Sequence, residues 1–196
     1  MADPLTIARS ELILGGQKSG KSRRAELLAH SWLARSPAHS AVLIATAQPW
    51  DEEMRERIVR HQQDRAERVP NLRTVEEPLQ LAHVLACHSH PQTLVVVDCL
   101  TLWLTNWLMP AENDEPNTAL EPDLRAQTAM LLGVIGQATG PVVLVGNEIG
   151  LGVIPLGHDT RAFVDALGRL NQDVARVCQR VTFTAAGLPL TLKGSP

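Results

Sequence analysis

The feature that most constrains this chain is the segment Gly15-Gly16-Gln17-Lys18-Ser19-Gly20-Lys21-Ser22. It follows a short apolar run, Glu11–Leu14, and precedes a segment of helical period, Ser22–Ala34. A strand, a turn with Gly-x4-Gly-Lys-Ser spacing and a helix are typical of the phosphate-binding loop, or P-loop. Its backbone N–H groups and the helix N-terminus attract phosphate oxygens. The segment therefore predicts a site for ATP or GTP; the alternative is a glycine-rich turn that happens to precede a helix.

Two side chains of this loop have chemical roles of their own. Lys21 supplies a mobile cation for the phosphates and is predicted to be catalytic, and Ser22 supplies a magnesium ligand. The partner ligand should be an acid at the carboxyl end of a buried strand. Asp98 closes the run Leu94–Val97 and meets this requirement, although an Asp there can also be an ordinary turn or cap residue. Ser22 and Asp98 are thus the predicted Mg²⁺ ligands.

Short apolar runs alternate along the chain with longer segments of helical period, as in a parallel sheet that is covered by helices on both faces. We therefore expect an α/β, doubly wound fold. Because 196 residues with 44% hydrophobic content suit one compact domain, residues 1–196 are expected to form a single P-loop nucleotide-binding catalytic domain. The expected strands are Glu11–Leu14, Ala41–Thr46, Thr93–Asp98, Val142–Asn147 and Val181–Ala185, with Leu190–Leu192 at an edge.

Two further segments have a clear pattern. A helical stripe of apolar residues is expected to face the core at Phe163, Leu167, Leu170, Val174 and Val177. The segment Pro110–Pro122 holds three prolines and four acids and has no period, so it predicts an exposed loop.

Composition excludes several classes of function. The formal charge is −3 and no long run of Lys or Arg occurs, which argues against nucleic acid or a membrane surface as a partner. Cys87, Cys99 and Cys178 lie far apart, so neither a disulfide framework nor a zinc site is expected. The chain has no apolar segment of about 18 residues and no leader pattern. We therefore expect a soluble, cytoplasmic protein.

The segment Asp51–Val69 predicts a helix whose inward stripe begins with Met54 and Ile58. At 3.6 residues per turn this stripe continues through His61 and Arg65, so two nitrogen-bearing groups fall where apolar residues normally pack. A lone histidine is more often a satisfied core residue, but an arginine one turn later favours a phosphate or carboxylate partner. A neutral imidazole beside a nucleotide can act as a base or as a nucleophile at phosphorus. His61 is therefore a candidate catalytic residue.

A second polar segment follows the expected strand at Val142–Asn147. It places Asn147, Glu148 and Gly150 beyond the carboxyl end of the strand, where open α/β sheets bind their ligands. A glycine-rich connection capped by polar side chains would explain the same residues. Both interpretations stay open from the sequence.

The motifs taken together resemble the bifunctional adenosylcobinamide kinase / adenosylcobinamide-phosphate guanylyltransferase family. The resemblance extends over nearly the whole chain. Its motifs are the phosphate-binding loop with Arg23-x-Ala25-Glu26, then Ile44–Ala47, Asp51–Met54, Arg57-Ile58-x-x-His61-x-x-x-Arg65, Thr74-x-Glu76-x-Pro78, Asp98–Asn106, Asn147-Glu148-x-Gly150-x-Gly152-x-x-Pro155, Arg161–Gln172 and Ala186–Lys193.

This resemblance implies a RecA-like fold, a homotrimer and two reactions of cobalamin biosynthesis, with ATP and GTP as substrates. A nucleoside triphosphate phosphorylates the aminopropanol hydroxyl of adenosylcobinamide, and GMP is then transferred from GTP to the product through a guanylylated histidine, which His61 matches. Besides the phosphate-binding loop, the implied nucleotide site comprises Ala45, Thr46, Ala47, Gln62, Gln63, Asp64, Arg65, Glu76 and Asp98. Contacts to the substrate are expected from Asn147, Glu148, Gly150 and Arg161.

Two other functions fit the residues without the resemblance. One is a different P-loop kinase for a small hydroxyl substrate, in which His61 is structural. The other is a RecA-like, ATP-driven binding or motor protein, which would usually act on a polymer and is disfavoured by the missing basic surface.

Overall fold

The computed structural model of the protein describes residues 5–109, 120–153 and 155–195. Seven strands form one sheet in the order β3-β2-β4-β5-β1-β6-β7. The strands are β1 (Ser10–Gly15), β2 (Ser40–Ala45), β3 (Leu72–Glu76), β4 (Thr93–Asp98), β5 (Val142–Val145), β6 (Arg180–Ala185) and β7 (Leu188–Lys193). β1 to β6 are parallel, and β7 pairs antiparallel with β6. The predicted mostly parallel sheet and the edge strand around Leu190–Leu192 are confirmed.

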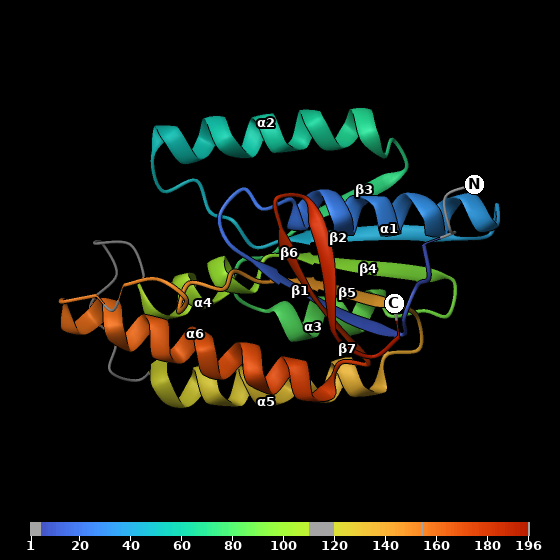
Figure 1. Cartoon of the computed structure of the whole chain (residues 1–196). Coiled ribbons are helices and arrows are strands. Elements are labelled where there is room, and N and C mark those ends of the chain that lie inside the picture. Colours follow the sequence, from blue (N-terminus) through green and yellow to red (C-terminus); the bar gives the residue numbers. More distant parts are fainter. Residues whose placement is uncertain (1–4, 110–119, 154, 196) are drawn as a thin grey trace.

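The helices lie on both faces of this sheet (Figure 1). They are α1 (Lys21–Arg35), α2 (Glu52–Arg68), α3 (Leu81–His88), α4 (Leu100–Leu108), α5 (Leu120–Gln137) and α6 (His158–Val177). One face packs against α1, and the other packs against α3, α4, α5 and α6. α2 lies outside α1, in a third layer, and contributes no core face to the sheet (Figure 1).

The strand sequences explain why both faces are covered. In β1, Leu12 and Leu14 belong to the core cluster on the α3–α6 side, whereas Ile13 belongs to the cluster on the α1 side. β4 and β5 alternate in the same way, and both are buried along nearly their whole length. A continuous run of Val, Ile and Leu is what a strand between two helical layers requires. The carboxyl ends of these strands form the edge at which the site lies.

Three expectations are corrected. β3 was not predicted, because in Leu72–Glu76 only Leu72 is buried and the remaining residues carry no apolar run. Val177 is 39% exposed, since α6 ends there and the neighbouring Cys178 packs inward instead. The predicted loop Pro110–Pro122 lies outside the described residues over 110–119, and residues 120–122 belong to α5.

Candidate nucleotide-binding site

The phosphate-binding loop joins β1 to α1 and is held closely by β6. A Cβ atom on Gly15 would lie 2.3 Å from the carbonyl oxygen of Thr184 and 2.6 Å from Oγ of Ser19, so no other residue fits there without a shift of the backbone. Lys18 and Gly20 have positive φ angles of 53° and 103°, which bend the loop back toward the helix. Gly15 and Gly20 are therefore required by the backbone geometry of the loop.

The start of α1 is open to an anion. Gly20 is the N-cap, and because glycine has no side chain it caps none of the N–H groups of the first turn. Lys21 is 7% exposed, and its Nζ donates to the carbonyl oxygen of Gly16 at 2.6 Å. Free N–H groups, a helix dipole and a cation at one point make a phosphate site.

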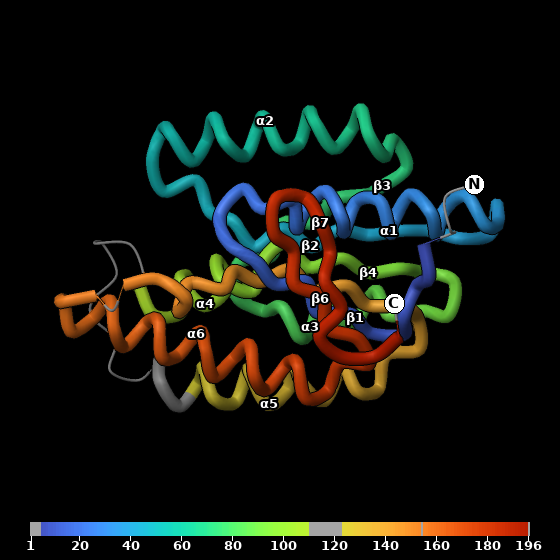
Figure 2. Tube along the Cα trace, viewed as in Figure 1, coloured from blue at the N-terminus to red at the C-terminus, as the bar shows by residue number. Residues whose placement is uncertain are grey.

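The β6–β7 hairpin braces this loop from the side. Ala186 and Gly187 form its tip, with φ angles of 51° and 78°. The N–H of Gly187 donates to the carbonyl oxygen of Ser19 at 2.8 Å. Figure 2 shows the hairpin, in red, reaching the start of α1, in blue. Residues far along the chain from the phosphate-binding loop thus complete it.

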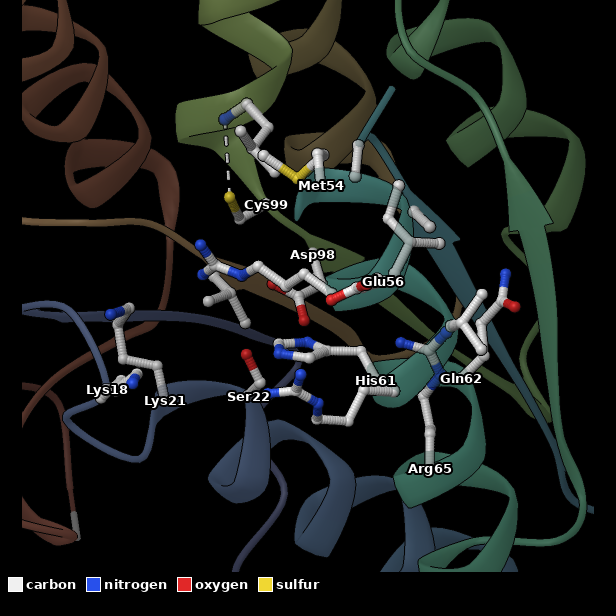
Figure 3. A pocket seen from close by; sticks show the side chains of 18 of the residues that line it. Lys18, Lys21, Ser22, Met54, Glu56, His61, Gln62, Arg65, Asp98 and Cys99 are labelled. Atoms are coloured by element: carbon white, nitrogen blue, oxygen red, sulfur yellow. Dashed lines mark hydrogen bonds between the residues drawn. The ribbon is translucent and has the colours of Figure 1, made fainter. Parts of the chain in front are cut away.

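A cavity of about 890 Å³ opens above the loop. α2 forms its opposite wall, and the ends of β2, β3, β4 and β5 form its floor. Figure 3 shows the imidazole of His61 and the side chains of Ser22 and Asp98 pointing into this space from three different elements. The predicted site residues that line it are Gln17, Lys18, Ser19, Gly20, Lys21, Ser22, Ala45, Ala47, His61, Gln62, Arg65, Glu76, Asp98 and Asn147.

The cavity is rich in positive charge. The basic side chains that line it are Lys18, Lys21, Arg23, Arg55, Arg57, Arg60, Arg65 and Arg68, and the acidic ones are Glu53, Glu56, Glu76 and Asp98. Burial lowers the pKa of Lys21, and the charge of Arg57 adds to this effect against the opposing influence of Cys99 and Asp98. Clustered cations in a partly desolvated space favour a polyanionic ligand such as a triphosphate.

α2 carries the histidine as predicted, but its stripe is only partly inward. Asp51 caps the helix by accepting from the N–H of Met54 at 2.7 Å. Met54 and Ile58 are half-buried and Arg65 is 7% exposed, whereas His61 is an exposed side chain on the cavity wall. Among the described residues, Arg65 has no hydrogen-bonded or ion-paired side-chain partner, and it faces the cavity. Along one helix the stripe thus changes from half-buried apolar residues to polar residues that line the cavity, as the sequence indicates.

Ser22 and Asp98 suit a magnesium ion by their chemistry. A hydroxyl and a carboxylate offer the hard oxygen donors that Mg²⁺ prefers, and an ion that also binds phosphates and water needs few protein ligands. Among the described residues there is no cluster of three or more His, Cys, Asp or Glu side chains that could bind a metal alone. The residues therefore fit a metal that arrives with the nucleotide.

Thr46 has a structural role instead of lining the cavity. It is fully buried, donates from Oγ1 to the carbonyl oxygen of Cys99 at 2.7 Å, and accepts from the N–H of Cys99 at 2.9 Å. Asn106 of α4 donates to the carbonyl oxygens of Thr46 at 2.8 Å and of Pro78 at 3.0 Å. The ends of β2, β3 and β4 are thereby tied together behind the site.

Comparison with known proteins identifies the family. A profile described as "Cobinamide kinase / cobinamide phosphate guanyltransferase" matches residues 11–192. The chain belongs to this family. It is 49% identical to the bifunctional adenosylcobalamin biosynthesis protein CobP of Pseudomonas aeruginosa, over 95% of this chain and 98% of that protein. It is 33% identical to the bifunctional adenosylcobalamin biosynthesis protein CobU of Escherichia coli, over 93% of this chain and 98% of that protein.

Membership in the cobinamide kinase / guanyltransferase family confirms the resemblance and the prediction of a kinase and guanylyltransferase enzyme. The fold agrees with it. The crystal structure of flagellar accessory protein FlaH from Methanocaldococcus jannaschii matches 96% of this chain and 80% of that chain with a TM-score of 0.53, at 12% identity. The predicted P-loop α/β fold, with a mostly parallel sheet and helices on both faces, agrees with this match. In the described residues no helix is long and apolar enough to cross a membrane.

Several residues predicted for the site of this family member lie outside the cavity lining. Arg161, in the first turn of α6, donates to the carbonyl oxygens of Pro155 and Leu156 in the preceding loop. Glu148 accepts from the N–H of Gly150 at 3.0 Å within its own loop. The predicted residues that are absent from the described lining are Gly15, Gly16, Thr46, Gln63, Asp64, Glu148, Gly150 and Arg161.

The structure also adds residues that the sequence reasoning missed. Arg57 lies four residues before His61, one turn earlier on α2, and lines the same cavity. α2 holds five arginines in 17 residues, and this density was the available signal. Cys99 lines the floor next to Asp98; it belongs to the Asp98–Asn106 motif, but the sequence reasoning assigned it no role at the site.

Proposed function

We propose that this enzyme phosphorylates the aminopropanol hydroxyl of adenosylcobinamide with a nucleoside triphosphate and then converts the product to adenosylcobinamide-GDP with GTP. The observation that carries the proposal is that Lys21 of the phosphate-binding loop and His61 of α2 line one cavity. A kinase needs the first group, and a guanylyltransferase with a covalent intermediate needs the second. The description of the family supports both activities, and the relatives are named as bifunctional proteins of adenosylcobalamin biosynthesis.

In the first reaction, the hydroxyl oxygen of adenosylcobinamide attacks the γ-phosphorus. The bond from that phosphorus to the bridging oxygen breaks, the nucleoside diphosphate leaves, and the hydroxyl proton passes to solvent. Lys21 and the N–H groups at the start of α1 stabilise the charge on the phosphate oxygens. Ser22 and Asp98 would hold Mg²⁺, which neutralises part of the phosphate charge when it is bound.

In the second reaction, a ring nitrogen of neutral His61 attacks the α-phosphorus of GTP. The bond to the bridging oxygen breaks and pyrophosphate leaves, so that GMP is joined to His61 through a P–N bond. A phosphate oxygen of adenosylcobinamide phosphate then attacks the same phosphorus, and the ring nitrogen recovers its electron pair. Arg57 and Arg65, which line the cavity on the same helix, stabilise the developing charge.

The nucleotide lies between the phosphate-binding loop and the inner face of α2 in this proposal. Gln62 donates to Glu76 at 3.1 Å, which joins α2 to the end of β3 beside the cavity. Ala45 and Ala47 leave room for the nucleoside at the end of β2. Gln63 and Asp64 are assigned to this site only by the matching of motifs.

The acceptor approaches from the end of β5 in this proposal. Asn147 lines the cavity there, and its loop continues through Glu148 and Gly150 toward Arg161. We assign the corrinoid contacts to Asn147 and, beyond the described cavity lining, to Glu148, Gly150 and Arg161. In this proposal Glu148 and Arg161 exchange their present hydrogen bonds for contacts to the corrinoid.

We also propose that the enzyme is a homotrimer and is located in the cytoplasm. Sedimentation of the purified enzyme tests the trimer.

The deciding experiment incubates the enzyme with α-³²P-GTP and magnesium. An acid-labile, base-stable label on the protein is expected, and it should be lost in His61→Ala. A label that survives in His61→Ala, or the absence of any label on the native enzyme, would sink the histidyl-GMP mechanism. Phosphorylation of adenosylcobinamide by ATP is measured separately and should persist in His61→Ala, because the first reaction does not use the imidazole.

A further inference from the structure

α2 is held to the rest of the protein by few apolar contacts. Of its residues Glu52–Arg68, only Arg65 is buried, and the helix lies outside α1 instead of against the sheet (Figure 1). A surface helix is usually fixed by an apolar stripe along one face. Met54 and Ile58 are only half-buried, so polar contacts contribute much of what fixes α2, and His61 on it, in position.

A groove separates α2 from α1 and contains one such contact. The space is about 310 Å³ and is lined by Arg23, Glu26, Leu27, His30, Arg68 and Val69. Across it, Nη1 of Arg68 on α2 lies 3.0 Å from Oε2 of Glu26 on α1. The side chain of Glu26 is 8% exposed, so few water molecules can hydrogen-bond to its carboxylate in place of Arg68. Removing the cation from such a buried carboxylate is costly.

The contact joins the two helices that carry the reacting groups. Glu26 follows Lys21 by five residues on α1, and Arg68 follows His61 by seven residues on α2. Seven residues are about two helical turns, or roughly 10 Å, so Arg68 and His61 lie on the same side of α2. Nη2 of Arg68 also lies 3.1 Å from Asp64, which fixes the guanidinium between the two helices.

We propose that Glu26 is a positioning residue for guanylyl transfer: through Arg68 it holds α2 at the orientation that places His61 at the nucleotide. The inference rests on the proposed role of His61. It assigns a function to Glu26, which belongs to the Arg23-x-Ala25-Glu26 motif and does not line the nucleotide cavity. A displacement of about 1 Å at a nucleophile can cost roughly 100-fold in rate.

The two reactions provide an internal control. Phosphorylation uses the phosphate-binding loop, which is held by β6 and the hairpin tip, and does not use His61. Loss of the contact should therefore slow the formation of histidyl-GMP more than it slows the kinase reaction. Simple destabilisation of the fold would reduce both rates together.

The test compares Glu26→Gln, Arg68→Gln and the double variant with the native enzyme. Glu52→Gln is the matched control, since Glu52 forms an ion pair of the same 3.0 Å length with Arg55 on the same helix, but both side chains are exposed. In Glu26→Gln, labelling by α-³²P-GTP should slow by about tenfold or more while the kinase rate changes by less than about twofold. Labelling in the double variant should be no slower than in Arg68→Gln, because both variants lose the same contact, the ion pair between Glu26 and Arg68.

Hydrogen–deuterium exchange provides a readout that does not depend on catalysis. The amides of α2 should exchange faster in Glu26→Gln than in the native enzyme or in Glu52→Gln. Unchanged exchange in α2, or an equal loss of labelling and kinase activity, would overturn the positioning role. If the native enzyme takes no label at all, the proposed function fails, and exchange alone still decides whether Glu26 holds α2.

Discussion

Nζ of Lys21 donates a hydrogen bond to the carbonyl oxygen of Gly16, five residues earlier in the same loop, at 2.6 Å. The loop thus carries an internal bond between its catalytic cation and its own backbone. Burial lowers the pKa of this lysine, so holding its charge is unfavourable to the protein alone. A triphosphate would offset that cost by supplying negative charge at the same point.

Lys21→Met should therefore separate activity from stability. We expect the kinase rate to fall by at least about 100-fold, because a donor aimed at the transferring group is lost. The free energy of unfolding should change by no more than about 1 kcal/mol, since the lost hydrogen bond is balanced by removal of a desolvated charge. A kinase assay and urea unfolding measure the two effects; a large loss of stability would contradict this account of the loop.

Asn106→Asp should weaken nucleotide binding although the residue lies behind the site. The change removes both donors to Thr46 and Pro78 and places carboxylate oxygens against two carbonyls. We expect a loss of about 2–4 kcal/mol in unfolding free energy and a higher KM for GTP. Thr105→Val is the control, because within the described part of the chain that hydroxyl donates to the carbonyl oxygen of Thr101 in α4 and to no other group. An unchanged KM in Asn106→Asp, measured where the variant is fully folded, would show that the contact serves stability alone.

Gly187→Ala should loosen the phosphate-binding loop. With φ at 78°, a Cβ at the hairpin tip costs about 1–2 kcal/mol, and relief of this strain would move the N–H that donates to Ser19. The expected result is a Kd for GTP that is raised by about threefold to tenfold. Gly187→Asn should be milder, since Asn tolerates this conformation better. Equal affinities in the native enzyme and both variants, measured by calorimetry, would argue against the brace.

The cysteines should react very unequally with a thiol reagent. Burial raises the pKa of Cys99 to about 11 and that of Cys178 to about 12, while Cys87 is exposed. At pH 8 fewer than about one in a thousand of the buried groups are thiolates, so one fast thiol per chain is expected natively and three in denaturant. Because the pKa of each buried thiol is higher in the folded protein than in the unfolded chain, the thiols contribute stability that is present below pH 9 and is lost as the pH rises toward about 11 for Cys99 and about 12 for Cys178. Rapid native reaction of Cys99 would contradict this burial.

The sequence predicted best what depends on neighbours along the chain. The phosphate-binding loop, the strand cores and the helix at Asp51–Val69 each follow from spacing and period, and all are present. β3 was missed because Leu72–Glu76 pairs with β2 along one edge and buries little of its own surface. Its identity as a strand depends on the partner and not on its own residues.

Side-chain direction was beyond the sequence. Thr46 follows directly after β2, beside two alanines of the site, yet it points inward to Cys99. Arg161 was predicted to contact the substrate because it belongs to a family motif. Its guanidinium instead donates to the carbonyl oxygen of Pro155 in the loop before α6. The groove beside Glu26 arises from the distance between two consecutive helices, α1 and α2, which no local period encodes.

The placement of β1 has a consequence for how the protein is made. β1 lies between β5 and β6, and its phosphate-binding loop is braced by the tip of the β6–β7 hairpin. During synthesis the glycine-rich segment therefore leaves the ribosome long before either neighbouring strand exists. Such non-local pairing slows folding. Although the phosphate-binding loop is translated before them, the nucleotide site should become competent only after β6 and β7 have been made, so nascent chains that lack this hairpin should bind nucleotide poorly.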